Sequence, residues 1–87
     1  MTTLPPARYG TPLTGRELQI LVRIAQGRTY AQIAADLGLS TASVCTHVRR
    51  LLAKLGARDR AHAVGIGMRT GLIGSHAVIR PGRRWLA

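Results

Sequence analysis

The fold is decided by the stretch TYAQIAADLGLSTASVCTHVRRLLAKL, residues 29–55 of this 87-residue chain. Its pattern predicts two helices joined by a tight turn at residues 37–40. Gly38 suits the left-handed backbone conformation that ends a helix, and Ser40 is a good N-cap for the second helix. Thr29 caps the first helix, and Gln32 completes a capping box with it.

The second predicted helix, residues 40–55, has one apolar side and one basic side. At about 100° per residue, its core-facing side chains are Val44, Val48, Leu51, Leu52 and Leu55. The short side chains of Ala42 and Thr46 lie opposite, one turn before Arg49. Such a surface can enter a groove of DNA, where Arg49 reaches a guanine edge.

Two basic residues on the same helix, Arg50 and Lys54, are then placed to contact phosphates. The alternative is that Arg49, Arg50 and Lys54 form only a solvated charged face. Two short helices around a glycine turn are what a DNA-binding helix-turn-helix requires. Near the start of the first helix, Thr29 and the neighbouring backbone amides form a phosphate clamp that the Tyr30 hydroxyl can also reach.

A further helix is predicted to begin after Leu13, with Thr14 as its cap and Glu17 closing a second capping box. Its core stripe consists of Ile20, Leu21, Ile24 and Ala25, and Gly27 ends the helix. Leu18 and Val22 widen this stripe, either as the edge of the core or as a partner surface.

The last predicted helix is capped by Asp59, runs from Arg60 to about Thr70 and ends at Gly71. Ala61, Val64 and Met68 are expected to face inward. Small residues four apart allow close helix crossing, so the opposite face predicts a homodimer contact at Ala63, Ile66 and Gly67. The alternative is that Gly65 and Gly67 simply loosen this helix.

The net charge of +10 indicates a polyanionic partner, and nucleic acid fits better than an anionic membrane surface. We expect an all-α chain with three parts: a flexible arm at 1–12, a four-helix helix-turn-helix domain at 13–73 and a basic tail at 74–87. Arg8 and Tyr9 would let the arm reach a minor groove or a neighbouring backbone. Arg80, Arg83 and Arg84 would add phosphate contacts from the tail, and nothing in the sequence places Trp85.

Enzymatic activity is not expected, because three acidic residues leave little general acid–base chemistry and His47, His62 and His76 have no matched carboxylates. Cys45 is the only cysteine, so no disulfide and no cysteine zinc site can form within one chain. We predict no metal and no cofactor. The N-terminus lacks a signal-peptide pattern, which favours a cytoplasmic, nucleoid-associated protein.

Residues 13–73 resemble the LuxR/GerE-type helix-turn-helix domain of bacterial transcription regulators. The matching residues are LTGRELQIL at 13–21, AQG at 25–27, QIAADLGLS at 32–40, SVCTHVRRLLAKLGARDR at 43–60, AV at 63–64 and GLI at 71–73. The resemblance implies four helices, of which the third reads DNA, and a fourth helix that commonly dimerises. The arginine-rich, alanine-rich composition indicates a bacterium or phage of high GC content.

The resemblance also implies roles for individual residues. Base contacts fall on Cys45, Thr46 and Arg49. Phosphate contacts fall on Thr29, Tyr30, Ser43, Arg50 and Lys54, with Arg58 and Arg60 as additions. The chain departs from the family pattern at Gly15, where proline is usual, and at Cys45, where a basic residue is usual. A thiol cannot donate the same strong contact, which puts base preference at that step in doubt.

The sequence therefore predicts a homodimeric regulator of transcription that binds double-stranded DNA with residues 40–55 in the major groove. Two alternatives stay open. One is an interaction module, similar to region four of sigma factors, that binds RNA polymerase or another regulator through Leu18, Val22 and the tail. The other is an architectural protein that binds DNA without sequence preference through its basic tails.

Overall fold

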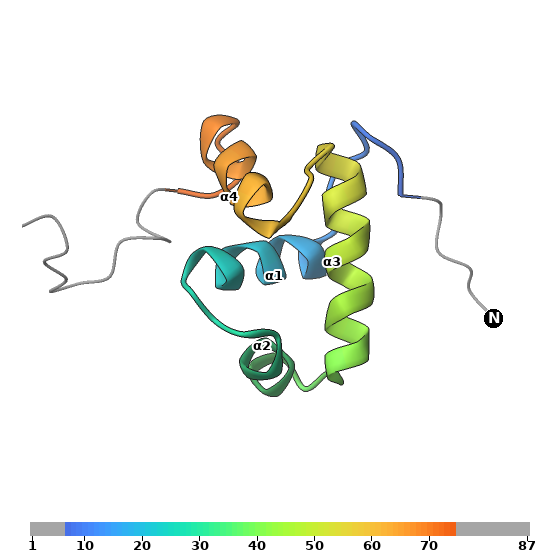
Figure 1. The fold of residues 1–87 in the computed structure, drawn as a ribbon, viewed down its shortest axis with the longest axis vertical. Helices are drawn as coiled ribbons and strands as arrows, with labels where there is room; N and C mark the ends of the chain where they lie inside the picture. Colours follow the sequence, from blue (N-terminus) through green and yellow to red (C-terminus); the bar gives the residue numbers. More distant parts are fainter. Residues whose placement is uncertain (1–6, 75–87) are drawn as a thin grey trace, which may run out of the picture.

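The computed structural model describes residues 7–74, which form four α-helices around one core (Figure 1). They are α1 (Gly15–Ala25), α2 (Tyr30–Leu37), α3 (Thr41–Leu55) and α4 (Arg60–Arg69). Figure 1 shows α3 as the longest rod at one side of the domain, with α2 near its start and α4 near its end. The prediction of an all-α, four-helix fold is confirmed.

Each helix begins at the cap that the sequence predicts. The side chains of Thr14, Thr29, Ser40 and Asp59 accept hydrogen bonds from backbone N–H groups in the first turns of α1, α2, α3 and α4. Both capping boxes are complete, at Thr14 and Glu17 and at Thr29 and Gln32. Gly38 has a φ of 68°, so the turn between α2 and α3 uses the left-handed conformation that favours glycine.

The core lies where α1 packs against α3 and α4, and α2 packs against α3. Its buried side chains are Ile20, Leu21, Ile33, Ala34, Val44, Val48, Leu51, Ala63 and Ile73. Leu18 and Val22 are half-buried and pack against this core. Their position agrees with the interpretation of these two residues as the edge of the core.

An ion pair is buried beside this apolar core. Glu17 is 1% exposed and Lys54 is 4% exposed, and Lys54 Nζ donates to Glu17 Oε1 over 2.7 Å. Arg50 Nε donates to Glu17 Oε2 over 3.3 Å, and the backbone N–H of Thr14 donates to Glu17 Oε1 over 2.8 Å. One carboxylate therefore caps α1 and joins it to two residues of α3.

The segment before α1 is held against the end of α3. The backbone N–H of Gly10 donates to the carbonyl oxygen of Lys54 over 2.9 Å, and Lys54 Nζ donates to the carbonyl oxygen of Pro12 over 3.2 Å. Within the predicted flexible arm at 1–12, Gly10 and Pro12 thus have specific partners in α3, and the extent of the arm stays a prediction. Residues 1–6 and 75–87 lie outside the described residues, and with them the predictions for Arg80, Arg83, Arg84 and Trp85.

We predict that Glu17→Ala lowers the free energy of unfolding by about 3–5 kcal/mol, because it leaves the buried Lys54 ammonium without its carboxylate. Urea unfolding followed by far-UV circular dichroism measures this loss. Arg16→Ala is the matched control, since Arg16 is exposed in the same helical turn, and it should change stability by less than about 0.5 kcal/mol. A loss below about 1 kcal/mol for Glu17→Ala would contradict the structural role of the pair.

The same site predicts a specific loss of stability in acid. Burial raises the pKa of Glu17, but hydrogen bonds from Lys54 and from the Thr14 backbone bring it below its ordinary value. The stabilisation is therefore complete above the unfolded pKa of about 4.3 and is lost as the pH falls through the lower folded pKa. Urea midpoints measured across this acid range should fall more steeply for the wild type than for Glu17→Gln, and parallel curves would argue against this origin.

Candidate nucleic-acid interface

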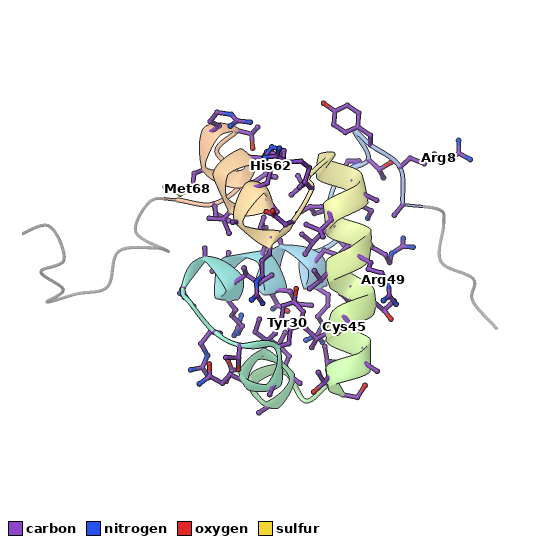
Figure 2. All side chains as sticks on the ribbon, viewed as in Figure 1. Arg8, Tyr30, Cys45, Arg49, His62 and Met68 are labelled. Carbon is purple, nitrogen blue, oxygen red and sulfur yellow. The ribbon has the colours of Figure 1, made fainter. Side chains whose placement is uncertain are left out.

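The side of α3 that faces away from the core exposes Ala42, Thr46, Arg49 and Ala53. Figure 2 shows the Arg49 side chain extending outward from this side of α3. Thr46 Oγ1 donates to the carbonyl oxygen of Ala42 over 3.1 Å, which holds the hydroxyl against the helix. The exposed side chains are thus short near the start of α3, and the Arg49 guanidinium follows one turn later. This shape and this charge suit a DNA groove.

The third residue predicted to read bases, Cys45, lies at the flank of this surface. It is half-buried and has a free thiol. A thiol is only a weak hydrogen-bond donor. The outer surface of α3 therefore brings Thr46 and Arg49 together, with Cys45 at its edge.

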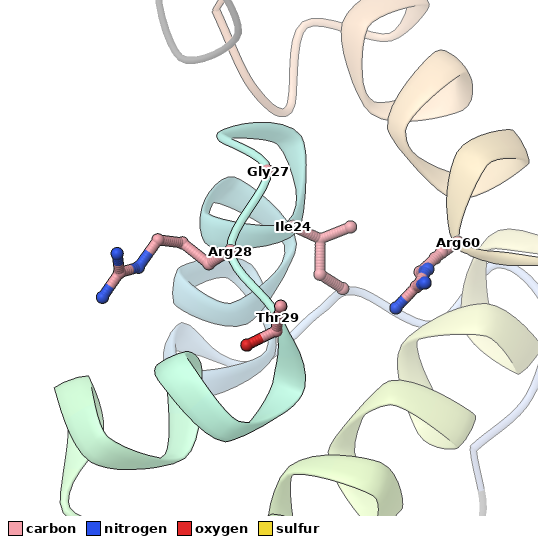
Figure 3. A pocket seen from close by; sticks show the side chains of 5 residues that line it. All are labelled: Ile24, Gly27, Arg28, Thr29 and Arg60. Carbon is pink, nitrogen blue, oxygen red and sulfur yellow. The ribbon is translucent and has the colours of Figure 1, made fainter.

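A second group of predicted residues gathers where α4 begins beside the start of α2. The guanidinium carbon of Arg60 lies 5.1 Å from the centre of the Tyr30 ring, a distance typical of a cation–π contact. A cavity of about 300 Å³ lies here. Figure 3 shows the residues that line it, Ile24, Gly27, Arg28, Thr29 and Arg60. Arg60 reaches toward it from α4, so a cation lies near the N-terminal turn of α2, where anions are favoured.

Arg28 lines the same cavity, but its side chain points to the other side of the segment (Figure 3). There it forms a two-pronged ion pair, with Nε 2.9 Å from Asp36 Oδ2 and Nη2 2.7 Å from Asp36 Oδ1. The hydrogen bonds from Arg28 hold the pKa of the Asp36 carboxyl below its usual value. Arg28 therefore fixes the connection between α1 and α2.

The prediction of a phosphate contact by Lys54 is wrong. Its side chain is 3% exposed and is bound to Glu17 and to the carbonyl oxygen of Pro12. The helical wheel predicts an outer flank for Lys54, but this flank of α3 packs on the N-terminal end of α1. Lys54 thus stabilises the packing of α3 against α1, and its buried ammonium group is not accessible to DNA.

Three other predicted phosphate residues have different surroundings. The Arg50 side chain is 16% exposed and bound to Glu17, so its guanidinium has a structural role in addition to the predicted one. Ser43 is half-buried in the first turn of α3, and its backbone N–H donates to Ser40 Oγ over 3.0 Å. Arg58 is exposed just before α4. Phosphate contacts by these residues stay predictions.

The prediction that Ala63, Ile66 and Gly67 form an outward dimer face of α4 is wrong, because the helix is turned so that Ala63 and Gly67 face the core. Ala63 and Gly67 are buried, and a β-carbon at Gly67 would lie 3.2 Å from Leu21 Cδ2 and 3.2 Å from Ile73 Cγ1. Small residues are needed here so that α4 can approach α1 within one chain. Ile66 is half-buried, and the exposed residues of α4 are instead Arg60, Ala61, Gly65, Met68 and Arg69.

The charge distribution leaves cations on the surface. Each acidic residue of the described part is engaged: Glu17 with Lys54 and Arg50, Asp36 with Arg28 and Arg23, and Asp59 as the cap of α4. None of them lies on the outer surface of α3. That surface therefore presents guanidinium without a competing carboxylate.

Sequence reasoning missed the role of Glu17 beyond its capping box. The signal was present, because Glu17, Ile20, Leu21 and Ile24 follow the i, i+3, i+4, i+7 spacing of one buried helix face. An acidic residue within such a stripe needs a buried cation as its partner.

Within residues 7–74, no three His, Cys, Asp or Glu side chains lie close enough together to hold a metal ion. Among the helices of this part of the chain, none is both long and apolar enough to cross a bilayer.

Four helices with a glycine turn between α2 and an outward-facing α3 define a helix-turn-helix domain. Residues 11–66 match the model of the family described as bacterial regulatory proteins, luxR family. The chain belongs to this LuxR family, as the resemblance in its sequence predicted.

Curated relatives are longer proteins that match about 70% of this chain. The "Probable transcriptional regulatory protein NarL" of Mycobacterium tuberculosis is 48% identical over 61 residues, which cover 70% of this chain and 28% of that protein. The "Uncharacterized transcriptional regulatory protein YxjL" of Bacillus subtilis is 42% identical over 62 residues, 71% of this chain and 28% of that protein. The "Transcriptional regulatory protein LiaR" of Bacillus subtilis is 39% identical over 61 residues, 70% of this chain and 29% of that protein. The chain thus aligns with less than a third of each relative, and these comparisons support DNA-binding transcription regulation.

The corrected orientation of α4 predicts opposite roles for its two glycines. Gly65→Ala should stabilise the domain by up to about 1 kcal/mol through helix propensity, because nothing lies within 4 Å of the new β-carbon. Gly67→Ala should be less stable than Gly65→Ala, since its β-carbon meets Leu21 and Ile73. Thermal unfolding of the two variants checks this order. If Gly67→Ala were the more stable variant, Gly67 would not be packed against α1.

Proposed function

We propose that this chain is a sequence-specific DNA-binding transcription regulator, acting on double-stranded DNA in the cytoplasm. The observation that carries the proposal is the outer surface of α3, where Thr46 and Arg49 are exposed and no carboxylate of the described residues intervenes. In this proposal α3 enters the major groove. Arg49 donates two hydrogen bonds to a guanine edge, while Thr46 and Cys45 contact neighbouring bases.

Phosphate contacts fix the domain on the duplex without reading sequence. We assign them to Thr29, Tyr30 and Arg60 around the cavity between α2 and α4, and to Arg58 beside it. The stacking of Arg60 on Tyr30 supports this assignment, because it holds the guanidinium in one place before DNA arrives. Ser43 and Arg50 add contacts at the flank of α3.

A homodimer is also part of the proposal, but through a different face from the one that the sequence indicated. Ala61 and Gly65 are small and exposed on α4, and Met68 is 40% exposed beside them. A second α4 can approach closely along such a face. Two-fold symmetric binding then requires two half-sites separated by one helical turn or a multiple of it.

The interaction-module alternative has weaker support. Leu18 and Val22, which would have formed its surface, pack against the core of the domain. A contact with RNA polymerase stays a prediction without a supporting surface among the described residues. The architectural role of the basic tails also stays a prediction.

Selection of bound sites from random DNA, followed by gel shifts, tests the proposal. Arg49→Ala should reduce discrimination at one base pair by about 1–3 kcal/mol. Arg60→Ala should weaken binding to all sequences alike and lower the salt slope by about 1. Circular dichroism confirms that both variants are folded. Equal losses on every DNA from both substitutions would reject base reading by Arg49, and failure of the wild type to select any sequence would reject the proposed function.

A further inference from the structure

The segment just before α1 reaches the far end of α3, and Arg8 lies at its outer limit. Arg8 precedes the family match at residues 11–66, so the family relationship assigns it no role. Its side chain is exposed. A turn in which the Thr11 N–H donates to the Arg8 carbonyl oxygen over 3.0 Å sets where the chain leaves the domain.

This segment is bound to α3 through Lys54, whose backbone carbonyl and side chain each form one hydrogen bond with it. The Lys54 carbonyl oxygen accepts from Gly10 over 2.9 Å, and Lys54 Nζ donates to Pro12 over 3.2 Å. Lys54 is itself held by Glu17 over 2.7 Å. The position of the segment is therefore coupled to the buried ion pair that joins α1 and α3.

Tyr9 adds a third contact at the residue that ends α3. A β-carbon at Gly56 would lie 2.7 Å from Cδ1 and Cε1 of Tyr9, so the ring lies directly over this glycine. Gly56 has a φ of 66°, which a residue with a side chain rarely adopts. The absence of a side chain at Gly56 thus makes room for the ring.

As a result, Arg8 lies on the same side of the domain as Arg49. Figure 2 shows both side chains extending beyond α3, away from the other three helices. Lys54 follows Arg49 by five residues, which is about 7.5 Å along the helix axis. The residue anchored at Lys54 is Gly10, and Arg8 lies two residues before it. Since the major groove is about 12 Å wide, the exposed Arg8 side chain can reach the wall of a groove that Arg49 occupies. Phosphates form that wall.

We propose that Arg8 is a phosphate-binding residue that extends the DNA contact beyond the helix-turn-helix, positioned by the attachment of residues 9–12 to α3. The proposal rests on the proposed function. It adds one sequence-independent contact per domain.

The test measures DNA affinity against salt for the full chain on a site selected by the wild type. Arg8→Ala should lower the slope of log affinity against log salt by about 0.9 for each bound domain, so that a fourfold rise in salt shrinks its deficit relative to wild type about 3.5-fold for one domain and about 12-fold for a dimer. Arg69→Ala is the matched control. It removes the same charge from an exposed position at the end of α4, which Figure 1 places across the domain from the outer surface of α3.

A second variant tests the positioning. Gly10→Pro removes the N–H that donates to the Lys54 carbonyl oxygen. Proline also cannot adopt the φ of 89° found at Gly10, and the variant keeps Arg8. It should reproduce most of the change in salt slope caused by Arg8→Ala. Phosphate-ethylation interference should show one interfering phosphate per half-site that disappears in Arg8→Ala.

The outcomes separate the two proposals. If the wild type binds no selected site, the proposed function fails. If the wild type binds specifically but Arg8→Ala and Arg69→Ala have equal slopes, the assignment of Arg8 is overturned and the charge acts only through the net field. If Gly10→Pro keeps the wild-type salt slope while Arg8→Ala lowers it, then the attachment to α3 does not position Arg8, and that part of the proposal is overturned.

Discussion

The carboxylate of Glu17 is the contact on which the arrangement of this domain depends. It lies at the start of α1, accepts from the backbone that it caps, and binds Lys54 and Arg50 of α3. Removing one partner of such a buried group leaves an uncompensated charge, which is far more costly than losing an exposed pair. The two ion pairs add directional contacts between α1 and α3 to the apolar packing of the core. The orientation of α3 is therefore supported both by its buried side chains and by the charged contacts at its inner flank.

That constraint divides the basic residues of α3 by function. Lys54 and Arg50 lie on the inner flank and stabilise the helix against α1, while Arg49 lies outside and keeps its charge for a partner. A similar division holds at the connection between α1 and α2, where Arg28 is bound to Asp36 and Arg60 lies over Tyr30. The acidic residues are few, and each one fixes a basic residue or a helix end. The remaining arginines of residues 7–74 are thereby left on the surface.

Most of the architecture could be predicted from local signals, because caps and turns depend on residues three or four apart. Thr14 with Glu17, Thr29 with Gln32 and the left-handed Gly38 are all of this kind. Lys54 and Ala63 could not be placed in this way. A helical wheel gives relative angles but does not say which neighbour covers a flank, and Lys54 meets Glu17 across 37 positions of sequence. The short side chains of α4 were predicted to serve an approach between helices; the approach is to α1 of the same chain.

The burial of Lys54 has a chemical consequence for the surface charge. It is the only lysine among thirteen basic residues, so every basic side chain outside the ion pair is an arginine. Guanidinium groups do not release a proton in proteins, whereas an ammonium group titrates and is the usual target of acetylation. The arginine charges that attract polyanions to this chain therefore persist at alkaline pH, and the only lysine ammonium is shielded from acetylation because the fold buries it against Glu17.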